Sequence, residues 1–158
     1  MSKLGKRTDQ RMAMLKNQVS ELLWYGQIET TVDRAKAVRS LAEKYITIAM
    51  RAYQDDVKVT KTVADAKGAK KEVVFTNDGP KKLAARRRLM AELVDLQEIK
   101  GEKESKSAFR ARIKDTKHPL IEKMFKEYAP KYDARKNELG QGGGYTRILK
   151  TGTRRGDA

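Results

Sequence analysis

Five cations gather in the ten-residue stretch KKLAARRRLM, which runs from position 81 to position 90. They are Lys81, Lys82, Arg86, Arg87 and Arg88, and no acidic residue stands among them. On a helix, three consecutive arginines spread over roughly 200–300° of the circumference, so at least one faces the buried side unless an anion packs there. Such a cluster suits phosphate groups, which nucleic acid supplies. The alternative is a solvated basic face, although no acid at helical spacing offsets the charge within the cluster.

Further cations lie near the N-terminus. Lys3, Lys6 and Arg7 form a basic arm, and Arg11 and Lys16 continue it along the polar face of the first predicted helix. Arms of this composition order on nucleic acid. Many plain disordered tails share the composition, so both interpretations stay open.

The C-terminal stretch GGGYTRILKTGTRRGDA, positions 142–158, combines glycines, an aromatic residue and arginines. In a strand, Tyr145, Arg147 and Leu149 project to the same side. An aromatic ring beside arginines suits base stacking with phosphate contacts, whereas burial of Tyr145 in the core is slightly favoured. We expect this strand to complete a small sheet and to deliver Arg154 and Arg155 to RNA. The glycines do not form a phosphate-binding loop, because no Lys-Ser/Thr pair comes directly after them.

Residues suited to catalysis are few. His118 is the only histidine, and it precedes Pro119 at a predicted helix start, where a turn or cap role is expected. No cysteine or second histidine can join it as a metal ligand. Asp55 and Asp56 form an exposed acidic pair, and paired carboxylates need burial to separate their pKa values for hydrolysis. We therefore predict no enzyme activity, no metal, no cofactor and no small-molecule substrate.

The composition agrees with a polyanion-binding protein. The 158 residues hold 36 Lys+Arg against 21 Asp+Glu, a formal net charge of +15, which calls for nucleic acid or, next, an anionic membrane surface. Hydrophobic residues make up 39%, enough for one modest core. The sequence has no apolar run of about 20 residues and no signal-peptide pattern at its N-terminus. The absence of cysteine fits an intracellular protein.

Apolar spacing predicts the first half of the fold. Steps of three and four between Met12 and Leu23 predict a helix that Gly26 ends. A β-branched stretch over 27–31 predicts a short strand, and a second helix follows it. Valines alternate with polar residues over 54–77, which predicts a hairpin insert with little net charge.

Prolines and glycines mark the second half. Pro80 opens a third helix, and the polar stretch 97–117 is a loop or contains a short helix. Pro119 opens a further helix, which Pro130 is expected to stop. A glycine hinge then leads to the last strand, over 145–150.

These elements predict an α+β fold of two layers, in the order helix, strand, three helices and strand or strands. A small sheet is packed by the helices, and a hairpin-like insertion interrupts the order. We expect a basic N-terminal arm over 1–8 and a single domain over 9–158, with insertions at about 54–77 and 97–117.

Five stretches match the pattern of a known family. They are RMAMLKNQVSELL (11–23), GQIETTVDRAKAVRSLAEKYITIA (26–49), LAARRRLM (83–90), IEKMFKEYAPKYDARK (121–136) and GGGYTRILKTGTRRGDA (142–158). Together they resemble the bacterial large-subunit ribosomal protein seventeen. The resemblance implies a two-layered fold that binds large-subunit ribosomal RNA near the outer end of the peptide exit tunnel. The two insertions are longer than the compact family pattern, so their contacts do not carry over. The family usually continues past Ala158 into a last apolar strand.

We therefore predict a non-enzymatic structural protein of the bacterial large ribosomal subunit, located on the cytoplasmic ribosome. Its partners are large-subunit ribosomal RNA and neighbouring large-subunit ribosomal proteins, with no membrane, and its cations replace counterions at RNA phosphates. The predicted rRNA-binding residues are Lys3, Lys6, Arg7, Arg11, Lys16, Lys36, Arg39, Arg86, Arg87, Arg88, Arg147, Arg154 and Arg155. Arg34 stands apart because Asp33 lies beside it. The alternative is a DNA-binding chromosome-architectural protein, which composition alone leaves open.

Overall fold

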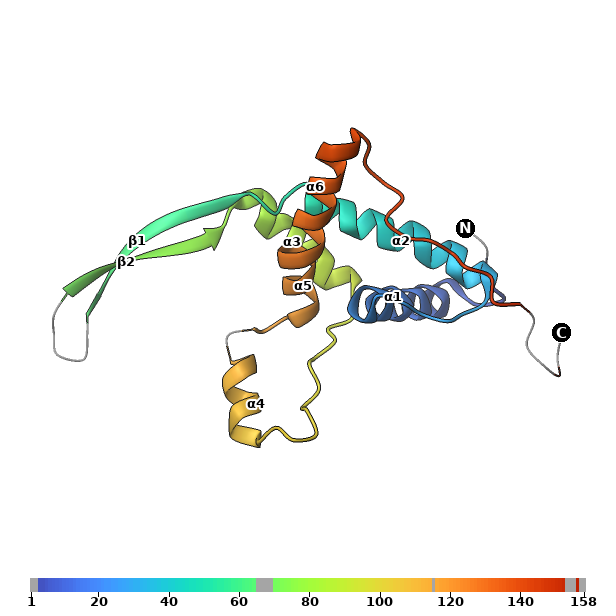
Figure 1. Cartoon of the computed structure of the whole chain (residues 1–158), viewed down its shortest axis with the longest axis horizontal. Helices are drawn as coiled ribbons and strands as arrows, with labels where there is room; N and C mark the ends of the chain where they lie inside the picture. The colour runs from blue at the N-terminus through green and yellow to red at the C-terminus, as the bar shows by residue number, and fades with distance from the viewer. Residues whose placement is uncertain (1–2, 65–69, 115, 153–155, 157–158) are drawn as a thin grey trace.

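Two long helices, α1 (Thr8–Tyr25) and α2 (Val32–Met50), lie side by side and form one half of the helical body (Figure 1). The computed structural model describes residues 3–64, 70–114, 116–152 and 156. Gly26 ends α1 as predicted: its φ of 83° is left-handed, and its N–H donates to the Leu22 carbonyl. The loop over 26–31 then returns the chain to α2.

Helix α3 (Pro80–Glu92) begins at the predicted proline, but a distant residue caps it. Gly79 occupies the N-cap position and has no side chain to accept from the first free N–H groups. The Asp55 carboxylate takes that role, because it accepts from the backbone N–H of Lys81 at 2.7 Å and of Lys82 at 3.3 Å. A Cβ on Gly79 would lie 2.5 Å from this carboxyl group, so the close approach requires glycine.

One helical run with a wider turn in its middle follows Pro119. It comprises α5 (Pro119–Lys123), a π-helical turn η1 (Met124–Tyr128) and α6 (Ala129–Leu139), so the prediction that Pro130 stops the helix is wrong. In a regular α-helix the ring of Pro130 would collide with the carbonyl of Lys126, four residues back. The π-turn, closed by the Ala129 N–H on the Met124 carbonyl, widens the helix just before the proline and relieves that collision.

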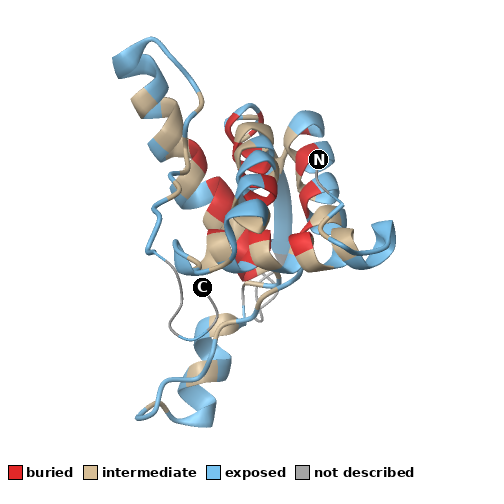
Figure 2. Cartoon of the chain, turned by 90° about the vertical axis from the view of Figure 1, so that its right-hand side faces the viewer, coloured by how far each residue is buried: buried red, intermediate tan, exposed pale blue. Residues whose placement is uncertain are grey.

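The hydrophobic core lies where these helices converge (Figure 2). Five elements of the body supply the largest fully buried apolar side chains: Leu15 and Val19 from α1, Val38 from α2, Leu89 from α3, Leu120 from α5 and Met124 from η1. Ser20 is also fully buried. Its hydroxyl donates to the Lys16 carbonyl and accepts from the Val94 N–H, each at 2.8 Å, so it joins α1 to the end of α3.

Two excursions leave this body (Figure 1). The predicted insert forms an antiparallel hairpin of β1 (Asp56–Ala64) and β2 (Lys70–Asp78), paired from Asp56↔Asp78 to Ala64↔Lys70. It projects away from the helices, and residues 65–69, which connect the two strands, lie outside the described residues. The second excursion, between α3 and α5, carries the short helix α4 (Lys106–Ile113), whose N-cap Ser105 accepts from the Ala108 N–H.

The α+β class with a hairpin-like insertion is confirmed, but the strands predicted at 27–31 and 145–150 do not form. Within the described residues, the sheet consists of the hairpin alone. The C-terminal segment is held by side chains instead of a backbone ladder. The Tyr145 ring packs on Tyr132 with centroids 4.7 Å apart, and the Thr146 hydroxyl donates to Glu43 at 2.9 Å. These contacts fix the segment along α2 without pairing it to residues 27–31.

Candidate nucleic-acid interface

One arginine of the predicted triplet lies inside a cluster of opposite charges. Asp56, Asp78, Lys82, Arg86 and Glu122 form this cluster, here called the charge junction. Arg86 Nε lies 2.5 Å from Asp78 Oδ2, and Arg86 Nη1 lies 2.5 Å from Glu122 Oε1. Lys82 Nζ lies 2.6 Å from Asp56 Oδ1 and 3.5 Å from Asp78 Oδ1. The junction therefore joins the base of the hairpin, α3 and α5.

Partial burial makes these pairs tight. The side chain of Arg86 is 20% exposed and that of Lys82 is 14% exposed, and both cations lie over the Phe125 ring. Burial alone would raise the pKa of Asp78 and Glu122. Hydrogen bonds from Arg86 and its charge, with help from the nearby lysines, outweigh burial and hold both carboxyl pKa values below their ordinary range. Burial likewise opposes the charge on Arg86, yet its two carboxylate partners raise its pKa.

Arg87 and Arg88 have a different environment from Arg86. Both side chains are exposed, and neither forms an ion pair within the described part of the chain. The prediction that one arginine of three faces the buried side is thus met by Arg86, which finds carboxylates at positions 78 and 122. Two arginines remain for an external anion.

Arg88 borders a hollow between α2, α3 and the C-terminal segment, here called the α2–α3 groove. The groove has a volume of about 470 Å³, and its cations are Lys44, Arg51 and Arg88. No ion pair engages any of the three within the described residues. Three unpaired cations around one concave surface can take up a phosphate backbone.

The single carboxylate that lines the groove is already engaged. Glu43 Oε1 accepts from Arg39 Nε at 3.3 Å and from the Thr146 hydroxyl at 2.9 Å. Gly143 and Tyr145 line the groove from the C-terminal segment. The Tyr145 ring is half-buried, with Tyr132 at one side and Arg135 at 5.4 Å, so its packing is internal and it is not presented for base stacking.

Lys44 and Arg51 were not among the residues predicted to bind RNA. A signal was present, because the two lie seven positions apart, which places them two turns apart on one face of α2 with Ser40 and Thr47. The sequence does not show that Arg88, from α3, lies beside this face of α2. The groove exists only once α2 and α3 are packed together.

The predicted N-terminal cations differ in exposure and in their partners. Lys3 and Lys6 are exposed, and Arg7 is exposed but pairs with Asp9 at 3.0 Å. Lys16 Nζ lies 3.3 Å from Glu92 Oε2 and donates to the Ala91 carbonyl, so it ties α1 to α3. Arg11 is half-buried, and its buried Nε has no partner among the described residues.

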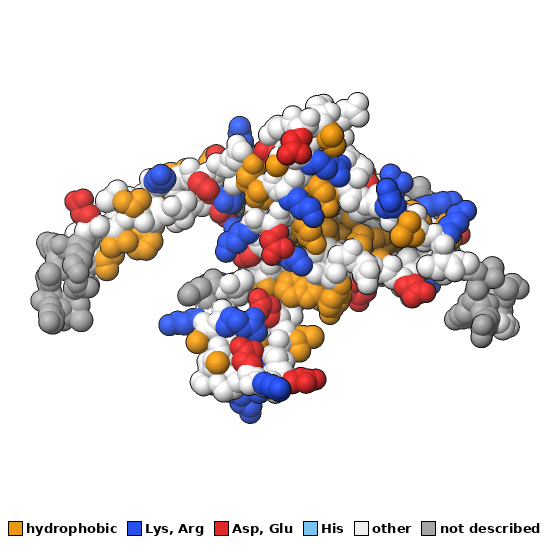
Figure 3. Space-filling view, in the orientation of Figure 1, with side chains coloured by type: hydrophobic (Ala, Val, Ile, Leu, Met, Phe, Trp, Pro, Cys, Tyr) orange, Lys and Arg blue, Asp and Glu red, His pale blue; other side chains and the backbone are white. Residues whose placement is uncertain are grey.

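The remaining predicted cations lie on or near α2. Lys36 and Arg147 are exposed, Arg39 pairs with Glu43, and Arg34 is half-buried. Arg154 and Arg155 lie outside the described residues. Figure 3 shows Lys and Arg side chains distributed over the helical body and α4, with hydrophobic side chains along the hairpin.

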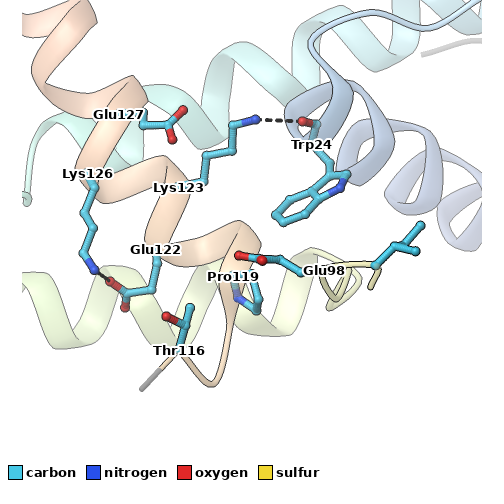
Figure 4. Close-up of a pocket in the computed structure, with 9 residues that line it drawn as sticks. Trp24, Glu98, Thr116, Pro119, Glu122, Lys123, Lys126 and Glu127 are labelled. Carbon is cyan, nitrogen blue, oxygen red and sulfur yellow. Dashed lines mark hydrogen bonds and ion pairs between the residues drawn. The ribbon is translucent and has the colours of Figure 1, made fainter. Parts of the chain in front are cut away.

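A second hollow, of about 490 Å³, lies beside α5 and has a different character (Figure 4). Glu98, Glu122 and Glu127 line it. Its two lysines are engaged: Lys123 donates to the Trp24 carbonyl at 2.8 Å, and Lys126 lies 3.2 Å from Glu122. This balance of charges makes it a poor phosphate site.

Other chemistry finds little support in the described part of the chain. No three or more His, Cys, Asp or Glu side chains come together there as a metal site. His118 occupies the N-cap position of α5 and its Nδ1 lies 3.1 Å from Asp95, in line with the expected turn role. Among the described helices, none has the length and apolar character to cross a membrane.

Comparison with known proteins gives one consistent family. The model of the family "Ribosomal protein L17" matches residues 14–158. The chain is 38% identical to the large ribosomal subunit protein bL17 of Lachnospira eligens, an alignment that covers 99% of this chain and 92% of that protein. It is 37% identical to the bL17 protein of Clostridium acetobutylicum, with 98% of this chain and 86% of that protein covered, and 36% identical to that of Clostridium tetani, with 98% and 87% covered.

We predict that Arg86→Met destabilises the free protein by about 2–4 kcal/mol, because it leaves Asp78 and Glu122 partly buried without their shared cation. The matched control, Arg87→Met, removes the same charge from the exposed face and should change stability by less than about 0.5 kcal/mol. Urea unfolding followed by circular dichroism measures both. Equal effects of the two variants would contradict the role assigned to the junction.

The junction also predicts an acid-sensitive stability. Because Asp78 and Glu122 have folded-state pKa values below their ordinary 3.8 and 4.5, their contribution is present above about pH 4.5 and is lost as the pH falls through the folded values. The free energy of unfolding should therefore drop from about pH 5 to about pH 3. In Arg86→Met the drop should be shallower, since the main cause of the lowered pKa values is gone. A parallel drop in both proteins would show that other carboxyl groups govern the acid sensitivity.

Proposed function

Because the chain belongs to the ribosomal protein L17 family, we propose that it is a structural constituent of the large ribosomal subunit. We propose that it binds ribosomal RNA through exposed cations that have no ion-pair partner among the described residues. The α2–α3 groove is the observation that carries the RNA-binding part of this proposal. It gathers three cations from two helices, and its one carboxylate, Glu43, is paired with Arg39 and accepts a hydrogen bond from Thr146.

The mechanism is charge neutralisation on a pre-formed surface. Lys and Arg side chains displace counterions from phosphates where RNA segments come together, and the release of those ions drives binding. The helical core keeps the cations in fixed positions, so little conformational entropy is lost on binding. No catalytic step belongs to this role.

The proposed phosphate contacts divide into three groups. The first group holds exposed cations that have no ion-pair partner among the described residues: Lys3, Lys6, Lys36, Arg87, Arg88 and Arg147, joined by the groove residues Lys44 and Arg51. The second group holds cations that are paired with a carboxylate or half-buried: Arg7, Arg11, Lys16 and Arg39. To bind RNA, a paired cation must leave its carboxylate or contact a phosphate at the same time, and the half-buried Arg11 must become more exposed. The third group holds Arg86, whose ion pairs with Asp78 and Glu122 fix α3, and Arg154 and Arg155, which are proposed as contacts from the sequence.

The proposal extends to partners and organisation. The chain contacts neighbouring large-subunit proteins as well as ribosomal RNA, at the side of the subunit near the peptide exit tunnel. Residues 1–8 act as a basic arm, and 9–158 form one domain with insertions at about 54–77 and 97–117. No observation favours the DNA-binding alternative, and membership of a ribosomal family argues against it.

Sedimentation tests the proposed role directly. A tagged chain expressed in its source cell should move with the large subunit in a sucrose gradient at low salt, because its phosphate contacts hold it there. A free tag run in parallel controls for trapping. Recovery of the tagged chain at the top of the gradient, or with the chromosome, would contradict the proposal.

Binding of the free protein to a structured RNA should depend steeply on salt. Affinity should fall by orders of magnitude between roughly 50 and 200 mM salt, as expected for several phosphate contacts. The triple variant Lys44→Gln, Arg51→Gln and Arg88→Gln should reduce the slope of log affinity against log salt by about 2–3.

A charge-matched control separates the groove from overall charge. Lys58→Gln, Lys100→Gln and Lys103→Gln remove three exposed cations from the hairpin and from the segment before α4. This control should leave the slope nearly unchanged. Equal slopes for the two triple variants would mean that the groove is not the contact surface.

A further inference from the structure

The hairpin has one apolar face and one polar face. Directly paired residues of an antiparallel ladder lie on the same face, and successive residues alternate between the faces. The register pairs Val59 with Phe75 and Lys61 with Val73, which gathers the large apolar residues on one side: Val57, Val59, Val63, Val73 and Phe75. The opposite face carries Lys58, Thr60, Thr62, Glu72, Val74 and Thr76. The hairpin is therefore amphipathic although it packs on no core.

The apolar face is open to solvent along its length. Val57 is 45% exposed, Val63 43%, Phe75 40% and Val73 39%, and none of them belongs to the core cluster. Figure 1 shows the hairpin projecting from the body, and the contacts described above join it to the helices at its base, through Asp56 and Asp78. A contiguous exposed apolar strip marks a surface that another molecule covers. A lone two-stranded hairpin is also marginally stable without packing on one face.

The chemistry of this face fits a protein better than RNA. Two lysines hold ladder positions on this face: Lys61 at its middle, which lies 5.9 Å from the centroid of the Phe75 ring, and Lys71 opposite Val63 at its outer end. The formal net charge of +15 comes largely from other surfaces, so RNA phosphates find stronger sites elsewhere on the chain. Apolar side chains with a cation at their centre instead match an apolar protein surface that carries a carboxylate.

A second copy of this chain is a poor occupant. Lys61 and Val73 lie at the middle of the described face, between the Val57 and Val63 positions. Two copies packed face to face about a two-fold axis would bring their Lys61 ammonium groups together, and the described part of that face holds no acid to separate them.

We propose that the apolar face of the hairpin is a docking surface for a neighbouring protein of the large subunit, which presents an apolar patch with a carboxylate opposite Lys61. This inference rests on the proposed function, because the partner is sought within the large ribosomal subunit. The RNA-binding surfaces place the chain in the subunit, and the hairpin then reaches sideways to the partner.

Site-specific photocrosslinking in purified large subunits tests this surface. Val73→benzoylphenylalanine places the probe on the apolar face, and Thr62→benzoylphenylalanine places it on the polar face one pair along the ladder. The probe at position 73 should join the chain to one large-subunit protein, through a peptide rich in apolar residues and containing Asp or Glu. Its yield should exceed that from position 62 on the order of tenfold, since contact is confined to one face.

A second pair of variants tests the chemistry of the contact. Phe75→Asp and Thr76→Asp add the same charge at adjacent positions on opposite faces. In the background of the position 73 probe, Phe75→Asp should cut the crosslink on the order of tenfold or more, as loss of a central anchor does, while Thr76→Asp leaves it intact. Thermal unfolding of the free chains checks the fold, because neither residue belongs to the core.

The outcomes distinguish this proposal from the proposed function. Crosslinks from position 73 to RNA or to a second copy, equal yields from both faces, or no product would overturn the docking surface while the chain still sediments with the subunit. A chain absent from the subunit would overturn the proposed function and the docking surface together.

Discussion

The pairing of Arg86 with Asp78 and Glu122 is the interaction on which the arrangement of this molecule depends. It holds the end of β2 against α3, which follows it directly in the chain, and it holds α3 against α5, which begins 27 residues after α3 ends. Asp55 works beside it, since its carboxylate caps α3 at the point where the hairpin leaves the body. A partly buried arginine is tolerated because two carboxylates and the Phe125 ring replace its water. Without this junction, the side-chain contacts described at the base of the hairpin would be reduced to the Asp55 cap of α3.

The junction also sorts the positive charge of the chain into two kinds. Arg86, Lys82 and Lys16 are paired with carboxylates of other helices or strands, so their charges are balanced within the fold. Arg88, Lys44 and Arg51 have no carboxylate partner among the described residues and border one groove. A net charge of +15 does not by itself say which cations meet a polyanion. The pairing within the fold makes that distinction, and it leaves the α2–α3 groove as the surface best suited to phosphate.

Local signals in the sequence predicted what local chemistry decides. Gly26, Pro80 and Pro119 mark helix boundaries because left-handed backbone and a missing N–H act at one position, and alternating valines predicted the hairpin. The prediction that Pro130 ends the helix was wrong, because the π-turn that accommodates the proline depends on how the helix packs in the folded protein. The prediction of strands at 27–31 and 145–150 was wrong. β-Branched residues favour an extended backbone, but they do not specify another strand with which it would pair. The roles of Arg86 and of the groove depend on residues 36 to 44 positions away, which no spacing along one helix reveals.

The most direct test of this account is an experimental structure of the large ribosomal subunit that contains this chain. The measured quantities are the distances from the cationic nitrogens of Lys44, Arg51, Arg86 and Arg88 to the nearest phosphate oxygens. The account predicts phosphate oxygens within hydrogen-bond distance, about 3 Å, of the groove residues, while Arg86 stays on Asp78 and Glu122. A groove that faces solvent or protein, or an Arg86 that leaves its carboxylates to bind RNA, would contradict it.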